Sequence, residues 1–153
     1  MIEENENADD PFNLQRFVVA QRGSYERALG EVKNGRKITH WMWYIFPQMK
    51  GLGSSYEADL YGIVSLDEAR EYLTHWVLGP RLREISAACL AHRDKSANEI
   101  FGSIDTLKLR SSMTLFAQVA EPGSVFEQVL DAFFDGAPDE TTLELLAASS
   151  DGS

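Results

Sequence analysis

The sequence has no long apolar run, and its first ten residues carry no apolar stretch at all. A membrane-spanning helix needs roughly 20 consecutive apolar residues, and no segment of the chain approaches that length. A secretory signal would begin with basic residues and continue with apolar ones, whereas this chain begins with acidic and polar residues. We therefore expect a cytoplasmic protein that does not associate with membranes.

Cysteine occurs once, at Cys89. A lone cysteine cannot form an internal disulfide, and the chain has no Cys/His set at the spacing of a zinc site. Leu82, Ile85 and His92 fall at helical intervals from Cys89, which favours a buried structural thiol over a nucleophile. We predict neither a metal site nor a bound cofactor.

Basic residues are scarce: 14 Lys and Arg stand against 24 Asp and Glu, for a formal net charge of −10. This charge repels phosphate backbones at long range and argues against duplex nucleic acid as the main partner. The length of 153 residues suits one domain, present as a monomer or a homodimer. By composition, residues 1–9 and 149–153 are disordered tails that flank a single globular domain at 10–148.

Helix-start signals, in contrast, are frequent. The capping-box pattern, a Ser or Thr followed three residues later by Glu, occurs at Ser65, Ser96, Ser124 and Thr141. Asp10 followed by Pro11 is a further predicted start. Apolar residues at helical spacing follow these signals, and Gly79-Pro80 is expected to end the stripe at 69–76. We predict a mainly α fold, a compact single-domain array of about six or seven helices.

An irregular segment is predicted at about 36–64, where no clean helical period exists. Pro47 disfavours helical geometry at the residue before it, so residues 40–47 form either a short helix that ends near Ile45 or a buried strand. We favour the short helix. The following Gly51–Ser55 loop lacks the lysine of a P-loop, so it is an ordinary mobile loop or a lid.

Six unbroken apolar or aromatic residues, Trp41 to Phe46, form the first candidate site segment. Such a run must be buried, and the polar groups at its ends, His40 and Gln48, must then find partners or ligands.

Just before this run, Arg36, Lys37 and His40 concentrate three potential positive charges within five residues. This pattern predicts an anion site, where Trp41 or Trp43 could stack a planar ring. The alternative is a solvated basic turn above a hydrophobic segment.

The helix expected at 104–120 carries polar residues inside its apolar arc, namely Asp105, Lys108 and Ser112. They are structural if Asp105 and Lys108 form a partly buried ion pair and Ser112 bonds a backbone carbonyl. They are functional if they line a pocket, where Lys108 binds an anionic group or acts as a base toward Ser111 or Ser112.

The order of motifs resembles a family of small bacterial proteins of unknown function that genome annotation sometimes mislabels as calpastatin. The matching pieces span about residues 10–147 and are Asp10–Phe17, Gly35–Gln48, Gly51–Ser55, Gly79–Leu82 and Asp105–Phe116. The resemblance implies a compact, mainly α-helical single domain and no assigned reaction. Its motifs include residues that the arguments above select: His40, Trp41, Gln48, Asp105, Lys108, Ser111 and Ser112.

The leading hypothesis is a pocket that binds a small anionic, planar ligand such as a nucleotide derivative. Its ligand-binding residues would be Arg36, Lys37, Trp41, Gln48, Lys108, Ser111 and Ser112. Whether the protein is an enzyme stays open; in a hydrolytic version, His40 or Asp105 would be the general base. The alternative is a non-catalytic interaction module or homodimer that uses the aromatic segment or the stripe at 126–134, and it predicts an exposed apolar patch. A third hypothesis, toxin- or antitoxin-like inhibition of a nuclease through acidic mimicry, is supported by the net charge alone.

Overall fold

The computed structural model describes residues 9–152, with side chains up to Ser149. Its ten labelled helices are α2 (Gln15–Gln21), α3 (Tyr25–Lys33), α4 (Met42–Ile45), α5 (Tyr56–Leu60), α6 (Leu66–Thr74), α7 (Leu78–Leu90), α8 (Ala97–Phe101), α9 (Ser103–Ala117), α10 (Val125–Phe134) and α11 (Glu140–Gly152). Within the described residues there is no strand, only one isolated parallel bridge between Met49 and Ile63. The mainly α prediction is confirmed. More helices are present than predicted; α5, with five residues, is too short to show a period.

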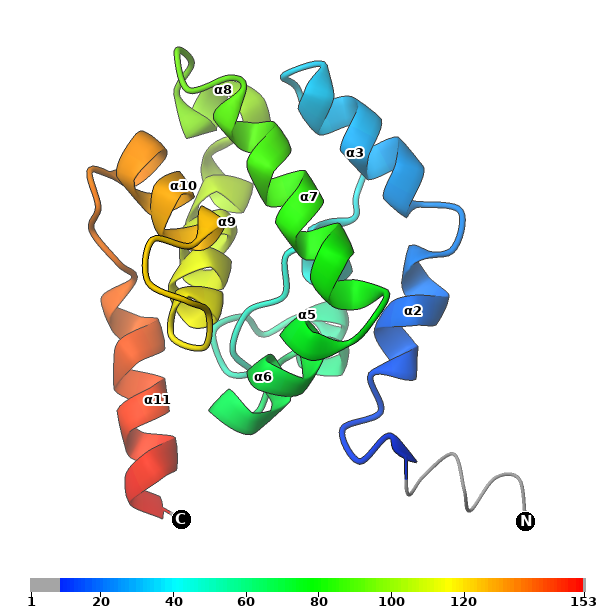
Figure 1. The fold of residues 1–153 in the computed structure, drawn as a ribbon, viewed down its shortest axis with the longest axis vertical. Helices are drawn as coiled ribbons and strands as arrows, with labels where there is room; N and C mark the ends of the chain where they lie inside the picture. The colour runs from blue at the N-terminus through cyan, green and yellow to red at the C-terminus, as the bar shows by residue number, and fades with distance from the viewer. Residues whose placement is uncertain (1–8, 153) are drawn as a thin grey trace.

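Helix α9 is the central element of the fold (Figure 1). It packs against α6, α8, α10 and α11, while α7 packs against α3, α6 and α10. All six residues from Ser111 to Phe116 are buried, so the second half of α9 lies inside the core on every side. The first turn of α9 is exposed or half-buried, and it is this end of the helix that reaches the surface.

Three of the predicted serine caps are confirmed. The hydroxyls of Ser65, Ser96 and Ser124 each accept the backbone N–H three residues later. Only Ser96 forms the full capping box, with Glu99 returning a bond from its carboxylate. Local hydrogen-bonding chemistry therefore fixes the starts of α6, α8 and α10.

The predicted cap at Thr141 is wrong, because α11 begins at Glu140 and Thr141 lies inside it. Asp139 takes the capping role: its Oδ2 accepts from the backbone N–H of Thr142 at 3.0 Å and from the Thr142 hydroxyl at 2.6 Å. Helix α11 continues to Gly152, so it includes most of the segment that composition assigned to a second tail. No proline or glycine interrupts it earlier. The first predicted tail lies outside the described residues except for Asp9.

The first predicted start is displaced by one turn. Helix α2 begins at Gln15 rather than Pro11, because Asn13 has a left-handed φ of 54° that interrupts the helix. Asp10 still caps it: the carboxylate accepts from the backbone N–H of Leu14 at 2.7 Å and of Gln15 at 3.0 Å.

Gly79-Pro80 begins a helix rather than ending one. Both residues lie in the first turn of α7, where a proline needs no backbone hydrogen bond. A Cβ on Gly79 would lie 2.0 Å from the carbonyl oxygen of Leu73, so glycine permits the close approach of α6 to α7. Helix α6 has already ended at Thr74, and Trp76, expected on its apolar stripe, is 84% exposed.

The aromatic run forms a short helix, as favoured, and not a strand. Helix α4 ends at Ile45, and Phe46 leaves helical geometry before Pro47. The helix has four residues and begins only at Met42, because Trp41 has a non-helical backbone with φ −142° and ψ 5°. Trp41, Met42, Ile45 and Phe46 are each only 1% exposed and lie in the core, whereas Trp43 and Tyr44 are half-buried.

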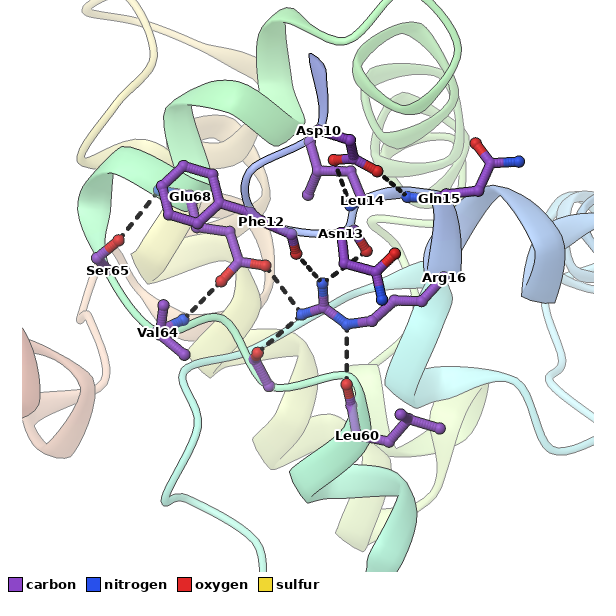
Figure 2. Close-up of polar contacts among 11 residues, drawn as sticks. Asp10, Phe12, Asn13, Leu14, Gln15, Arg16, Leu60, Val64, Ser65 and Glu68 are labelled. Atoms are coloured by element: carbon purple, nitrogen blue, oxygen red, sulfur yellow. Dashed lines mark hydrogen bonds and ion pairs between the residues drawn. The ribbon is translucent and has the colours of Figure 1, made fainter. Parts of the chain in front are cut away.

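Arg16 ties the irregular segment to α2, as Figure 2 shows. Its five N–H donors bond the carbonyl oxygens of Phe12, Asn13, Leu60 and Gly62, at 2.6 to 3.1 Å, and Oε2 of Glu68, at 2.8 Å. The other oxygen of Glu68 accepts from the Val64 backbone N–H at 2.9 Å, so Glu68 does not close the predicted capping box with Ser65. We call Arg16, Glu68 and these backbone groups the Arg16 cluster.

Candidate functional site

A cavity of about 370 Å³ opens between residues 37–43 and the start of α9. One wall is formed by Lys37 and residues 40–43, and the other by residues 101–105 and Lys108. We call this cavity the Asp105 pocket. It brings together the basic residues that precede the aromatic run and the polar residues at the start of α9.

Glu31, on α3, shapes the first wall. Its carboxylate accepts hydrogen bonds from the backbone N–H groups of Ile38 and Thr39, the Thr39 hydroxyl and the Trp41 indole N–H, at 2.7 to 3.0 Å. Burial alone would raise the pKa of Glu31, but these hydrogen bonds outweigh it and lower the pKa from 4.5 to about 2. A buried carboxylate therefore holds residues 38–41 in one conformation.

Lys37 is buried, with a side chain only 6% exposed. Its ammonium group donates to the carbonyl oxygen of Thr39 at 2.7 Å and pairs with Oδ2 of Asp105 at 2.8 Å. It also lies 4.9 Å from the centre of the Trp41 ring. Lys37 thus joins the two walls and has little capacity left for a ligand.

Lys108 is held more loosely. Its ammonium lies 3.8 Å from Oδ1 of Asp105 and 5.1 Å from the centre of the Trp43 ring, and its side chain is 24% exposed. The predicted Asp105–Lys108 pair is therefore present, but it is longer than the Lys37–Asp105 pair. Lys108 is the ammonium group that a ligand in the pocket could approach.

The side chains that line the pocket carry a net positive charge although the chain is acidic. Among them, two ammonium groups share one carboxylate, a formal charge of +1. The carboxylate of Glu31 lies behind the wall, where four hydrogen bonds satisfy it, and it does not line the cavity. The first turn of α9 also lines the pocket and has no side-chain cap, so the positive end of the helix dipole adds to this charge. The arrangement favours an anion.

Three other predicted residues have different surroundings. Arg36 is exposed and is not among the residues that line the pocket; its backbone N–H donates to the backbone carbonyl of Glu31 at 3.0 Å. Gln48 is also outside the pocket, and its backbone carbonyl accepts from the backbone N–H of Ile63 at 3.0 Å. Trp41 lines the pocket but is 1% exposed, so it is a wall and not a stacking platform.

Ser111 and Ser112 also lie outside the pocket. The Ser111 hydroxyl donates to the carbonyl of Leu107 at 3.1 Å, and the fully buried Ser112 hydroxyl has no partner among the described residues. Ser112 lies seven residues beyond Asp105, which is about 10 Å along the helix axis. The serines are therefore in the buried half of α9, and no hydrogen bond joins either to Lys108 in the described part of the chain.

One residue of the site, Glu31, was not predicted, and Trp43 was predicted only as one of two possible stacking residues. Trp43 is half-buried and lines the pocket, whereas Met42 and Ile45, three residues apart, are each 1% exposed. That spacing within a short helix would have predicted that Trp43 faces outward. Glu31 offered no comparable signal, because it lies beside the apolar stripe of α3.

No group of three or more His, Cys, Asp or Glu side chains in the described residues is arranged to hold a metal ion. Among the same residues, no helix is long and apolar enough to cross a bilayer. Burial raises the pKa of the Cys89 thiol to about 12, as expected for a cysteine packed inside the core.

Comparison with known proteins decides the family. The family model described as "Protein of unknown function (DUF1810)" matches residues 11–146. The chain belongs to the DUF1810 family. A solved structure, the conserved hypothetical protein Rv1873 from Mycobacterium tuberculosis, is 48% identical, with a TM-score of 0.88 over 90% of this chain and 99% of that one. No curated protein matches the chain. The family and the fold are thereby established, and neither comparison names an activity.

Proposed function

We propose that this DUF1810 protein binds a small organic anion with a planar ring in the Asp105 pocket. The observation that carries the proposal is the excess ammonium group: Lys37 and Lys108 share one carboxylate beside a cavity of about 370 Å³. Small-molecule sites are commonly cavities of roughly 300 to 1,000 Å³ with apolar walls and a few convergent polar groups. The Asp105 pocket has this character, near the lower end of the size range.

The two lysines have different roles in the proposal. Lys37 fixes the walls, because its ammonium already has short contacts to Asp105 and Thr39. Lys108 contacts the anionic group, because it has one long ionic contact and is more exposed. When the Lys108 ammonium moves toward the anionic group of the ligand, it no longer covers the Trp43 ring. The face of that ring can then contact the ring of the ligand.

Hydrolysis is a second step that the same site could support. His40 lines the pocket and is exposed, so it can approach a water molecule near a bound ligand. Asp105 is less suited as a base, since both its oxygens face lysine ammonium groups. A binding assay that also measures product therefore tests His40 directly.

The alternative function, pairing through the aromatic segment, has less support. It requires an exposed apolar patch, but Trp41 and Phe46 are each 1% exposed within one chain. In the stripe at 126–134, Phe126, Val129 and Leu130 are likewise buried. These observations favour ligand binding over an interface made by either segment.

A thermal-shift panel tests the proposal, with inorganic phosphate, phenyl phosphate, nucleoside mono- and diphosphates and aromatic carboxylates as probes. A ligand present at about 100 times its Kd stabilises the folded state by about 2.7 kcal/mol. For a chain of this length that stabilisation corresponds to a rise in Tm of about 5 to 10 °C. Product formation is measured for each probe that binds.

Lys108→Gln should abolish the shift. The matched control is Lys50→Gln, since Lys50 is an exposed lysine outside the pocket that pairs with Asp59 at 3.5 Å. A panel without any shift, or an equal shift in the Lys108 variant, would contradict the proposal.

A further inference from the structure

Three exposed aliphatic residues line the Asp105 pocket or are adjacent in sequence to residues that line it. Ile38 and Ile104 are each 71% exposed, and Leu107 is 65% exposed. Ile104 lines the cavity, Leu107 directly precedes Lys108 on α9, and Ile38 directly follows Lys37. We call these three residues the apolar rim.

The apolar rim and Lys108 share one side of α9. At about 100° per residue, Ile104, Leu107 and Lys108 fall within an arc of about 100°. Leu109 is fully buried, so the core lies on another side of the helix. A molecule whose anionic group contacts Lys108 can therefore extend along Ile104 and Leu107 without crossing the helix.

Ile38 is held in place, although it is exposed. Its backbone N–H donates to Oε1 of Glu31 at 2.7 Å, and the backbone N–H of the preceding Lys37 donates to the carbonyl of Ile100 at 2.7 Å. These bonds fix this part of the loop against α3 and against the end of α8. The exposed Ile38 side chain is thus carried by an ordered backbone, directly after the lysine that pairs with Asp105.

We infer that the ligand of the Asp105 pocket is an amphiphilic anion, in which an anionic group and a ring are joined to an apolar substituent. This inference rests on the proposed function. The anionic group lies at Lys108, the ring lies at Trp43, and the substituent covers the apolar rim. A strongly hydrated ligand would leave these three aliphatic side chains in water, whereas an apolar substituent removes their surface from water.

A small molecule fits the rim better than a protein partner does. A stable protein interface uses about 20 to 30 residues a side, and the rim supplies three aliphatic side chains. The rim is also continuous with a cavity, since Ile104 belongs to both. A small ligand can fill the cavity and cover the rim at once.

Isothermal titration calorimetry with phenyl phosphate and 4-butylphenyl phosphate tests the inference. Each fully buried methylene group strengthens binding by about fourfold. Partial burial of the butyl group should therefore make 4-butylphenyl phosphate at least about tenfold tighter than phenyl phosphate. The double variant Ile38→Ser/Leu107→Ser should lose this gain and keep the affinity for phenyl phosphate, since neither residue lines the cavity.

The control variant is Val19→Ser, which changes an aliphatic residue of α2 that is 51% exposed, and it should keep the tenfold gain. If circular dichroism shows the double variant to be unfolded, Ile38→Ser alone repeats the test from the loop and should reduce the gain.

Equal affinities for the two probes in the wild-type protein would overturn the inference and leave the proposed function intact. Failure of Lys108→Gln to weaken phenyl phosphate binding, or binding of neither probe, would overturn the proposed function and the inference with it. A gain retained in the double variant, or rim-dependent self-association in sedimentation velocity, would overturn the small-molecule assignment.

Discussion

The Arg16 cluster and the Asp105 pocket are both built around partly buried ion pairs, and they differ in how many of their charged groups have partners. Arg16 and Glu68 balance one another, and each N–H of the guanidinium has an acceptor at 2.6 to 3.1 Å. In the pocket, Asp105 is shared by Lys37 at 2.8 Å and Lys108 at 3.8 Å. The first group is complete, whereas the second carries an additional positive charge next to a cavity.

This difference separates a structural role from a binding role. When every N–H donor of a charged side chain already has an acceptor, no donor is left for a ligand. Removing one partner of such a pair leaves the other charge buried without a counter-charge. A charged side chain whose donors are not all paired can bind a further partner without losing a short contact. The number of partners around a charge is therefore more informative about function than its burial alone.

The largest expected effect is in the Arg16 cluster. Arg16→Met removes five hydrogen bonds and leaves the carboxylate of Glu68, only 2% exposed, without its cation. We expect a loss of about 3 to 5 kcal/mol in the free energy of unfolding. Urea denaturation measures it.

The control for this change is Arg70→Met, because Arg70 pairs with Asp67 at 2.9 Å while their side chains are 55% and 79% exposed. Its effect should stay within about 0.5 kcal/mol. Similar small losses in both variants would show that the Arg16 cluster is not a structural cross-link.

The next effect concerns the wall of the pocket. Glu31→Gln keeps the shape of the side chain but places an amide where the carboxylate accepts four hydrogen bonds. We expect a loss of about 2 kcal/mol at neutral pH, since charged acceptors bind more strongly than neutral ones. Urea denaturation and the thermal shift with phenyl phosphate measure the effects on fold and site.

The pH dependence of Glu31 provides a second measurement. Its folded pKa of about 2 lies below the ordinary 4.5, so the stabilisation is present above pH 4.5 and is lost as the pH falls toward 2. The wild-type protein should lose up to about 3 kcal/mol more than Glu31→Gln across this window. If the free energy of unfolding fell equally with pH in the two proteins, the lowered pKa of Glu31 would be contradicted.

A smaller effect separates the two lysines of the pocket. Lys37→Met removes the shorter, more buried pair and should cost about 1 to 2 kcal/mol of stability, while Lys108→Met should cost less than about 0.5 kcal/mol. Binding of phenyl phosphate should be lost in the Lys108 variant. Equal destabilisation by the two substitutions would remove the distinction between a structural and a ligand-contacting lysine.

The smallest effect is expected at Ser112, which belongs to neither region. Its hydroxyl is fully buried and has no partner among the described residues, so Ser112→Ala should change stability by less than about 0.5 kcal/mol or raise it slightly. Phenyl phosphate binding should not change. Urea denaturation and calorimetry measure these two quantities.

Thr114→Val is the control for Ser112, because the Thr114 hydroxyl donates to the Arg110 carbonyl and accepts from the Asp139 backbone, both at 2.8 Å. Its loss should be about 1 kcal/mol or more. Weaker phenyl phosphate binding by Ser112→Ala would contradict this expectation and show that Ser112 contributes to the binding site.

Sequence patterns predicted those parts of the fold that depend on local interactions. Ser65, Ser96 and Ser124 begin helices because a hydroxyl and a backbone N–H a few residues apart suffice for a cap. At Thr141 the same pattern failed, because Asp139, two residues earlier, caps α11 instead. Local rules propose a helix start, and neighbouring side chains decide its exact residue.

The candidate site was predicted in part. Lys37, His40, Asp105 and Lys108 do line one pocket, as the charge pattern and the helix projection suggested. Ser111 and Ser112 do not, because the projection of a helix assigns faces and cannot say which half of its length is covered by other helices. Arg36 and Gln48 also lie outside the pocket, since adjacency in sequence does not fix where a loop side chain points.

The sequence by itself determined the helical class, the starts of α6, α8 and α10, the burial of most of the aromatic run and the acidic charge of the chain, because each depends on composition or on residues a few positions apart. Tertiary structure alone decided that Lys37 reaches Asp105 across 68 positions, that Arg16 is saturated and Lys108 is not, and that Ile104 and Leu107 stay exposed beside the pocket. The reason is physical. Partners and solvent exposure depend on how distant elements pack, and that packing is set by the whole core at once.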